Sequence, residues 1–341
     1  MLRAFLLFIA ILFLSGCTGG GGTSAPPTLK IGLVAPFEGI HRPLGYEALF
    51  GVKLALQERN SAQGMHGYRI ELVALNDFDD PGEAQIQAQA LVADPDVLGV
   101  VGHLSSAATL AALPVYQAAR LALSIPWSMA ETGAGPTGVV KVAATYQETS
   151  AYLDTMSRER GFNNRLEVFE RELPALAADT GALYLKTDGV MAGEIILALE
   201  QANISLPLLG QVDVGSPQMV QVAKEAANGL IFVSPGPDPQ HIAGAGSFIE
   251  TYQALAGFPP GPRAVLAYDA THVLLDAIEQ AGRIINHRPA RAEVSAAIAS
   301  VQRQGLSGEI RFDAQGQRIH APVWVYQISE EKYPGVLLAP Q

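Results

Sequence analysis

The chain is poor in cysteine, in basic residues and in charge of any kind. It has 341 residues, with one cysteine, 22 lysines and arginines, 33 aspartates and glutamates, and a formal net charge of −11. A single cysteine excludes an intramolecular disulfide and a cysteine-built metal site. The acidic balance argues against a nucleic-acid partner, which needs a basic surface. The fold must be held by its hydrophobic core alone, and a chain of this length usually forms two domains.

Motifs of common enzyme and metal sites are also missing. There is no Gly-x-Ser-x-Gly elbow, and the seven histidines lie far apart, without the spacing of a zinc pair. Residues 133–138 fit the dinucleotide-binding pattern, but Pro136 and the strand-like run that follows indicate a loop. The acidic run Asp77–Asp80 lacks the glycine and the distant glutamate of a calcium loop. We therefore expect no cofactor, no metal and no enzymatic activity, and an exported hydrolase with a site assembled from distant residues stays the third alternative.

The longest apolar run lies near the N-terminus and leads to the only cysteine. Arg3 precedes Ala4–Leu14, and Ser15-Gly16-Cys17 follows. A positive start, a short apolar stretch and small residues are typical of a secretory signal peptide, which we assign to residues 1–16. The stretch is too short for a transmembrane helix, which needs about 20 apolar residues.

The residues around this cysteine resemble a bacterial lipobox, in which the cysteine is lipidated and becomes the new N-terminus. We therefore predict lipidation of Cys17 and a flexible glycine-rich tether over residues 17–28, stiffened by Pro26-Pro27. The protein would be exported and lipid-anchored to a bacterial membrane, facing the periplasm or the outside of the cell. The alternative is a secreted protein with a stray thiol.

Short apolar runs alternate with helical patterns along the rest of the chain. Strands are expected at residues 29–35 and 69–75, with a helix between them and another that begins at Pro81, capped by Asp80. Continuously apolar strands alternating with helices predict an α/β fold with parallel sheets covered on both faces. We also expect strands at residues 97–102, 121–125, 182–186, 206–209 and 230–233, and helices at residues 45–62, 105–119, 146–160, 190–202, 217–227 and 264–281.

In the C-terminal part, the hydrophobic pattern is expected to change from the period of a helix to that of strands. Residues 292–304 predict one helix, and residues 308–312 and 322–328 predict two strands around a turn at Asp313–Gly316.

Several segments, in order and spacing, resemble the leucine/isoleucine/valine-binding group of type I periplasmic binding proteins, which serve branched-chain amino acid ABC transporters. The resemblance covers nearly the whole exported body and implies two doubly wound lobes joined by three hinge crossings, near Ala143, Arg263 and Ile319. Lobe 1 would comprise residues 29–143 and 264–318, and lobe 2 residues 144–263 and 319–341. The segments are Lys30–Pro36, Leu75–Pro81, Val100–Ser106, Ala267–Ala270 and Leu306–Asp313.

The resemblance implies a ligand between the lobes, outside the carboxyl ends of the strands. Ser106 matches the position where the family places a hydroxyl on the ligand carboxylate, and unpaired N–H groups at the start of that helix favour an anion. Ser105 or Ser106 is equally suited to cap the helix. Trp127-Ser128-Met129 matches a second contact segment, in which Trp127 either stacks on the ligand or packs in the core.

Three features depart from the family pattern. Met129 stands where a hydroxyl is usual, and Leu44 where several members carry an aromatic ring. In lobe 2, Asp188 or Asp213 would supply the negative charge for a ligand ammonium, although each is also suited to cap a helix. The stretch between residues 145 and 183 is short by one strand–helix unit, so we expect a smaller second lobe with an altered half of the cleft.

These observations predict an extracytoplasmic solute-binding lipoprotein of an ABC importer. It would capture a small amino acid or a related amide or carboxylate, present it to an ABC permease and act as a monomer. The alternative is a ligand sensor, or a degenerate binding protein whose second lobe serves protein contacts.

Overall fold

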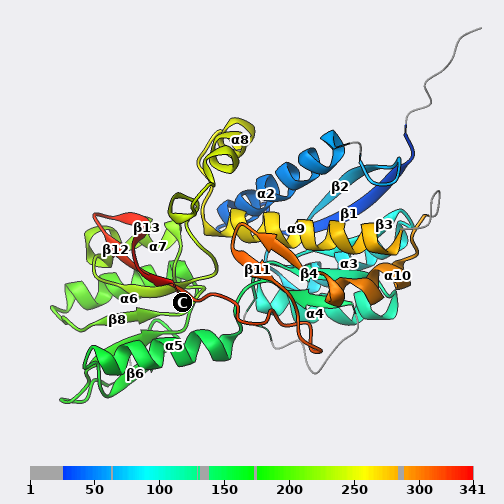
Figure 1. Ribbon diagram of the computed structural model, residues 1–341. Coiled ribbons are helices and arrows are strands. Elements are labelled where there is room, and N and C mark those ends of the chain that lie inside the picture. The colour runs from blue at the N-terminus through cyan, green and yellow to red at the C-terminus, as the bar shows by residue number, and fades with distance from the viewer. Residues whose placement is uncertain are drawn as a thin grey trace, which may run out of the picture.

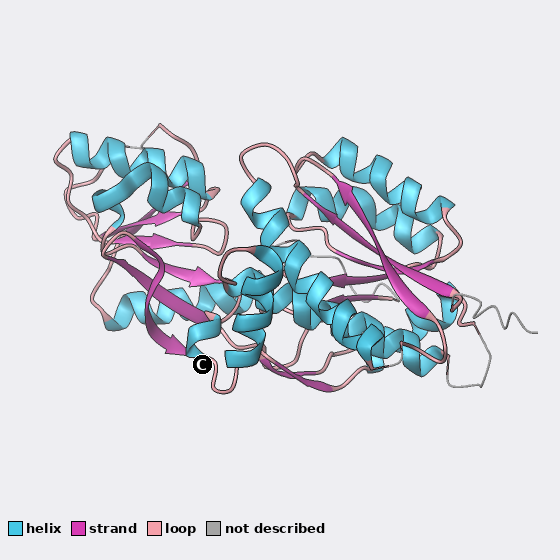
Figure 2. Ribbon diagram, turned by 90° about the horizontal axis from the view of Figure 1, so that it is seen from above, coloured by secondary structure: helices cyan, strands magenta, loops and turns pink. Residues whose placement is uncertain are grey.

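A computed structural model describes residues 26–62, 64–128, 130, 138–172, 175–282 and 288–340. The predicted signal peptide, Cys17, most of the tether and Met129 lie outside the described residues. Two separate sheets, each flanked by helices, form two lobes (Figures 1 and 2). The predicted α/β fold with parallel sheets is therefore confirmed. Across the described part of the chain, no helix has both the length and the apolar character needed to span a membrane.

The sheet of lobe 1 is fully parallel and has the strand order β2-β1-β3-β4-β5. Its central strands are buried on both faces, as the continuous apolar runs predicted. Helices α3 and α4 pack on one face, and α2, α9 and α10 on the other. The close packing of α2 on α9 requires Gly51, because a Cβ there would lie 2.5 Å from the carbonyl oxygen of Ala264. The elements are β1 (Thr28–Ala35), α2 (Arg42–Ser61), β2 (Arg69–Asn76), α3 (Pro81–Ala93), β3 (Val97–Val101), α4 (Ser106–Ala118), β4 (Ala122–Ile125), β5 (Val139–Lys141), α9 (Pro262–Ala281), α10 (Arg291–Ala297) and the short 3₁₀ helix η3 (Ile298–Ser300).

The sheet of lobe 2 has the order β13-β12-β9-β8-β7-β6, in which the last four strands are parallel and β12 and β13 antiparallel. Helix α5 covers one face, and α6 and α7 the other. Between β6 and β7 the structure shows no helix among residues 169–172 and 175–181. The elements are α5 (Tyr146–Glu159), β6 (Arg165–Val168), β7 (Ala182–Leu185), α6 (Gly189–Gln201), β8 (Leu208–Gly210), α7 (Pro217–Ala223), η1 (Lys224–Ala227), β9 (Ile231–Ser234), η2 (Pro239–His241), α8 (Gly246–Ala256), β12 (Trp324–Ser329) and β13 (Lys332–Pro340).

The chain passes between the lobes three times. The passages are residues 142–145, residues 235–245 and residues 311–323. Arg318, in the third passage, is 3% exposed and donates to the carbonyl oxygens of Val142 at 3.2 Å and Ser307 at 2.9 Å. This buried guanidinium therefore ties the first and third passages together.

Helix α8 follows the second passage and lies against lobe 1. Phe248 and Tyr252 of this helix pack on Leu54 of α2, and the Tyr252 hydroxyl donates to the carbonyl oxygen of Glu47 at 3.0 Å. The lobe boundaries drawn from the sequence stay predictions, but α8 is anchored on α2 although it falls in the range assigned to lobe 2.

The structure corrects the predictions for the C-terminal part. The helix predicted over residues 292–304 ends at Ala297, and the chain then forms a hairpin of β10 (Arg303–Gly305) and β11 (Gly308–Ile310). The buried carboxylate of Asp269 holds the hairpin turn by accepting from the backbone N–H groups of Leu306 and Ser307 at 2.9 and 2.8 Å. The two strands predicted around residues 313–316 do not pair with each other, because β11 pairs with β10 and β12 joins the sheet of lobe 2.

Candidate ligand-binding site

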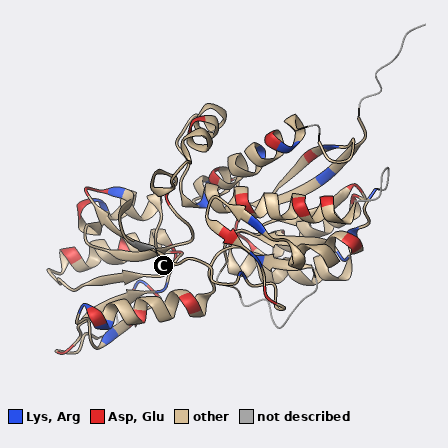
Figure 3. Cartoon of the chain, in the orientation of Figure 1, with Lys and Arg blue, Asp and Glu red and all other residues tan. Residues whose placement is uncertain are grey.

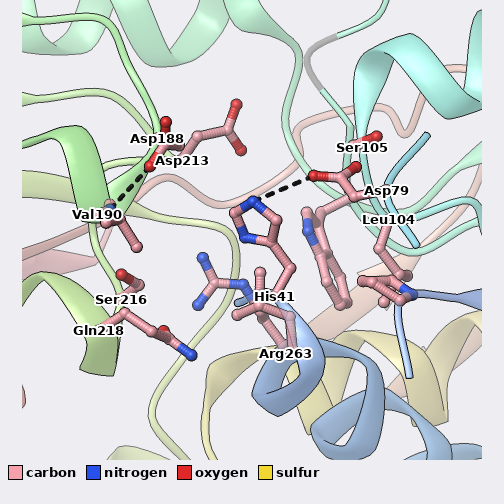
Figure 4. A pocket seen from close by; sticks show the side chains of 14 residues that line it. His41, Asp79, Leu104, Ser105, Asp188, Val190, Asp213, Ser216, Gln218 and Arg263 are labelled. Atoms are coloured by element: carbon pink, nitrogen blue, oxygen red, sulfur yellow. Dashed lines mark hydrogen bonds and ion pairs between the residues drawn. The ribbon is translucent and has the colours of Figure 1, made fainter. Parts of the chain in front are cut away.

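A cavity of about 140 Å³ lies between the lobes and is lined by both of them (Figure 4). The residues from lobe 1 follow the ends of β1, β2, β3 and β4, and those from lobe 2 follow β7 and β8. Ligands of α/β proteins bind outside these carboxyl ends. A closed cavity of about 150 Å³ holds a molecule the size of benzene, so the space suits a small ligand. The lining residues are Pro36, His41, Leu44, Asp79, Leu104, Ser105, Trp127, Asp188, Gly189, Val190, Asp213, Ser216, Gln218 and Arg263.

The aspartates of the acidic run after β2 have different roles. Asp77 is buried, with its Oδ2 atom 2.8 Å from Nδ1 of His103, and Asp80 caps α3 by accepting from the Glu83 N–H at 2.8 Å. Asp79 lines the cavity, where its Oδ2 lies 3.4 Å from Nε2 of His41. In the described part of the chain, no group of three or more His, Cys, Asp or Glu residues is placed to hold a metal ion. The run therefore contributes one carboxylate to the cavity.

Lobe 1 adds a helix N-terminus and an aromatic ring. Ser105 caps α4, its Oγ accepting from the Ala108 N–H at 3.4 Å. The ring of Trp127 is almost fully buried, and the Arg263 guanidinium lies 5.8 Å from its centroid, within the range of a cation–π contact. This wall of the cavity therefore combines unpaired backbone N–H groups with an apolar surface.

Lobe 2 contributes two carboxylates. Asp188 caps α6, because its Oδ1 accepts from the N–H groups of Val190 and Met191 at 2.8 and 3.0 Å. Asp213 follows β8 and is open to the cleft, without a hydrogen bond or ion pair to any described residue. The surrounding protein displaces water and raises the pKa of Asp213, although Arg263 opposes this shift. In Figure 4 these two carboxylates and that of Asp79 lie along the same edge of the cavity. Together they favour a positively charged ligand group.

The loop from β8 to α7 presents an unpaired amide. Ser216 caps α7 by accepting from the Met219 N–H at 3.1 Å. Gln218 lies in the first turn of α7, and both its Oε1 and its Nε2 are buried without a hydrogen-bond partner among the described residues. Buried amides are nearly always paired, so this one requires an explanation.

Arg263 connects the cavity to both lobes. It is 2% exposed and begins α9, where its backbone N–H donates to Oε1 of Glu47 at 2.8 Å. Its two Nη groups donate to lobe 2, to the Tyr333 hydroxyl at 2.9 Å and the Gly215 carbonyl at 3.0 Å. Its Nε has no partner among the described residues. The side chain that lines the cavity is therefore also a contact between the lobes.

The structure brings some of the predicted site residues together. Ser105, Trp127, Asp188 and Asp213 line the cavity. Ser106 and Ser128 do not line it; their hydroxyl oxygens lie 3.5 Å apart, and Ser128 Oγ accepts from the Ala130 N–H. Met129 lies outside the described residues. What each residue does for a ligand stays a prediction.

Other lining residues were not predicted from the sequence. Asp79 was noted only within an acidic run, and Arg263 only as a crossing point. Gln218 and His41 carried no motif, but each belongs to a segment that follows a strand, His41 before α2 and Gln218 at the start of α7, and ligand groups gather there in α/β folds. A systematic reading of every strand end would have included them.

Two α/β lobes with a polar cavity at the ends of both sheets define a bilobal ligand-binding protein. The sequence model of the periplasmic binding protein family matches residues 28–171 and 169–333, and the chain belongs to that family. The resemblance to its leucine/isoleucine/valine-binding group is confirmed by the relatives found.

One relative is the leucine-, isoleucine-, valine-, threonine- and alanine-binding protein of Pseudomonas aeruginosa. It is 25% identical over 348 residues, which cover 89% of this chain and 90% of that protein. Among solved structures, the branched-chain amino acid transporter substrate-binding protein LivJ of Streptococcus pneumoniae, in complex with isoleucine, has a TM-score of 0.80. It is 21% identical, and the match covers 92% of this chain and 99% of that one.

A solute-binding protein of R. palustris in complex with benzoate has a TM-score of 0.75 and 18% identity, with 92% of this chain and 96% of that one covered. These likenesses establish the fold.

Proposed function

We propose that the protein is an extracytoplasmic solute-binding lipoprotein of an ABC importer, which captures a small amino acid or a related amide or carboxylate between its lobes. The observation that carries this proposal is the cavity, because carboxylates from both lobes and the guanidinium of Arg263 converge on it. A zwitterion matches such a lining better than an apolar or singly charged molecule.

The ligand carboxylate would lie at the start of α4, beside Ser105. Unpaired backbone N–H groups and the helix dipole favour an anion at that position. Ser106 begins the same helix and stays a candidate for a direct contact, as does Ser128 beside it. The ligand ammonium would lie near Asp213 and Asp188, and Trp127 would cover the apolar part.

The mechanism would be capture without chemical change. A ligand held by both lobes favours the closed arrangement over the open one, and hinge closure then removes it from water. The closed form would be presented to the permease. The relatives named above are described as binding proteins, which supports a role without catalysis.

A thermal-shift screen of the purified full chain tests the proposal. The panel holds the common L-amino acids, small amides, and benzoate as a carboxylate without an ammonium group. A ligand present at 100 times its dissociation constant adds about 2.7 kcal/mol to the free energy of unfolding and raises the melting temperature. We expect such a shift from at least one amino acid, with the compound recovered unchanged. A panel without any shift, or a ligand that is converted to product, would contradict the proposal.

A further inference from the structure

We propose that the cavity selects an amino acid whose side chain ends in a carboxamide, through hydrogen bonds with Gln218 and Arg263. This inference rests on the proposed function and deepens it by naming the ligand class. None of the ligands named for the relatives above has a side chain that ends in a carboxamide.

The first observation is the amide of Gln218. Both of its polar atoms are buried at the cavity wall and have no partner among the described residues. An amide presents a donor at one end and an acceptor at the other, and turning it by 180° exchanges them without removing either. A ligand that pairs this amide must therefore offer both an acceptor and a donor.

The second observation is the Nε of Arg263. Both Nη groups of this buried side chain donate hydrogen bonds to lobe 2. One of them binds Gly215, in the loop just before α7, the helix that carries Gln218. Nε is left as a buried donor without a partner among the described residues. The cavity thus holds unpaired donors from two side chains and one unpaired acceptor.

A carboxamide matches this set with two separate atoms, one an acceptor and the other a donor. Its oxygen accepts from Arg263 or Gln218, and its NH₂ donates to the Gln218 oxygen. An aliphatic side chain pairs none of these atoms. A carboxylate pairs the donors but leaves the acceptor unpaired.

The charge of the cavity lining also favours a ligand with a carboxamide side chain over one with a carboxylate side chain. The carboxylates of Asp79, Asp188 and Asp213 outnumber the guanidinium of Arg263 around the cavity. A second carboxylate on the ligand adds like charge to this set, whereas a neutral carboxamide does not. We therefore expect L-glutamine or L-asparagine to bind more tightly than L-glutamate and L-leucine.

Isothermal titration of the full chain with these four amino acids tests the inference. We expect the better amide to bind at least tenfold more tightly than leucine or glutamate. Gln218→Met keeps the length of the side chain and removes the amide; it should weaken binding of that amide at least tenfold and that of leucine less than threefold. Gln218→Glu keeps acceptor oxygens but removes the donors, and it should also weaken binding of that amide at least tenfold. Gln221→Met, at an exposed position of the same helix, is the matched control and should leave all affinities unchanged.

The outcomes separate this inference from the proposed function. If leucine binds as tightly as the amides, or if Gln218→Met changes both affinities equally, the carboxamide assignment is wrong while the solute-binding role stands. If none of the four amino acids binds, and no compound of the wider thermal-shift panel changes the melting temperature, the proposed function itself is contradicted. Melting temperatures of the variants without ligand identify any loss that results from misfolding.

Discussion

At the scale of single residues, Asp213 holds a charge that the fold disfavours. Its carboxylate is open to the cleft, yet the surrounding protein raises its pKa, against the opposing effect of Arg263. A group whose pKa is raised in the folded chain binds its proton more tightly there than in the unfolded chain. Stability associated with protonation is present at low pH and is lost as the pH rises through the folded-state pKa. The raised pKa therefore predicts that ionised Asp213 lowers the stability of the free protein at neutral pH, by an amount that its exposure to solvent reduces.

We predict that Asp213→Asn raises the melting temperature of the ligand-free protein at pH 7 and lowers its affinity for an amino acid at least tenfold. The carboxylate that reduces stability is the one that attracts the ligand ammonium. In the unmodified protein, affinity should fall as the pH is lowered, beginning at a higher pH than an ordinary aspartate would give. Calorimetry between pH 4 and 7 measures this, and an unchanged profile in the Asn variant would exclude Asp213 as the titrating group.

The site could be predicted from the sequence only in part, for physical reasons. Ser105, Trp127, Asp188 and Asp213 line the cavity, because strand ends in a parallel sheet meet at one edge, while their contacts with a ligand stay predictions. Gln218 could not be singled out, since its importance depends on the lack of a hydrogen-bond partner. The inter-lobe contacts of Arg263 likewise exist only once both lobes are placed.

At the scale of elements, Asp188 both begins a helix and faces the cavity. An N-cap aspartate contributes about 1 kcal/mol, and asparagine caps as well as aspartate does. We predict that Asp188→Asn leaves the stability nearly unchanged and weakens amino-acid binding, because only the charge is removed. Asp188→Ala should lose about 1 kcal/mol of stability as well. Urea unfolding and titration calorimetry measure the two effects.

Asp80 provides the matched control for this helix start. It caps α3 with the same type of hydrogen bond, at 2.8 Å, but does not line the cavity. Asp80→Ala should cost a similar amount of stability, about 1 kcal/mol, and leave binding unchanged. Equal affinities for Asp188→Asn and the unmodified protein would mean that Asp188 is only a helix cap.

Regular elements were predicted well where hydrophobic periodicity was strong. The strands of lobe 1 and helix α5 lie where the apolar runs and the helical pattern of residues 146–160 indicate. The hairpin of β10 and β11 was missed, because its turn is specified by the distant, buried Asp269. The assignment of β12 to the other lobe depends on pairing with β9, which no local pattern encodes.

At the scale of the whole molecule, the predicted lipid anchor can be tested directly. Figure 3 shows both acidic and basic residues in each lobe. We predict that Cys17→Ser moves the protein from the membrane fraction to the soluble exported fraction, because the lipid chains are lost. Immunoblots of the fractions measure this, with an exposed Ser→Ala change elsewhere as the control. Persistence in the membrane fraction would indicate another form of attachment.

The packing of α8 on α2 determines where the second passage between the lobes can bend. With Phe248 and Tyr252 seated on lobe 1, residues 257–261 join two segments that belong to the same rigid unit. A pivot must then lie earlier, in the irregular stretch from residue 235 to residue 245 that leaves the sheet of lobe 2 after β9. A reporter domain inserted in that stretch would respond when the lobes open and close. One inserted after α8 would move together with lobe 1 and would not respond.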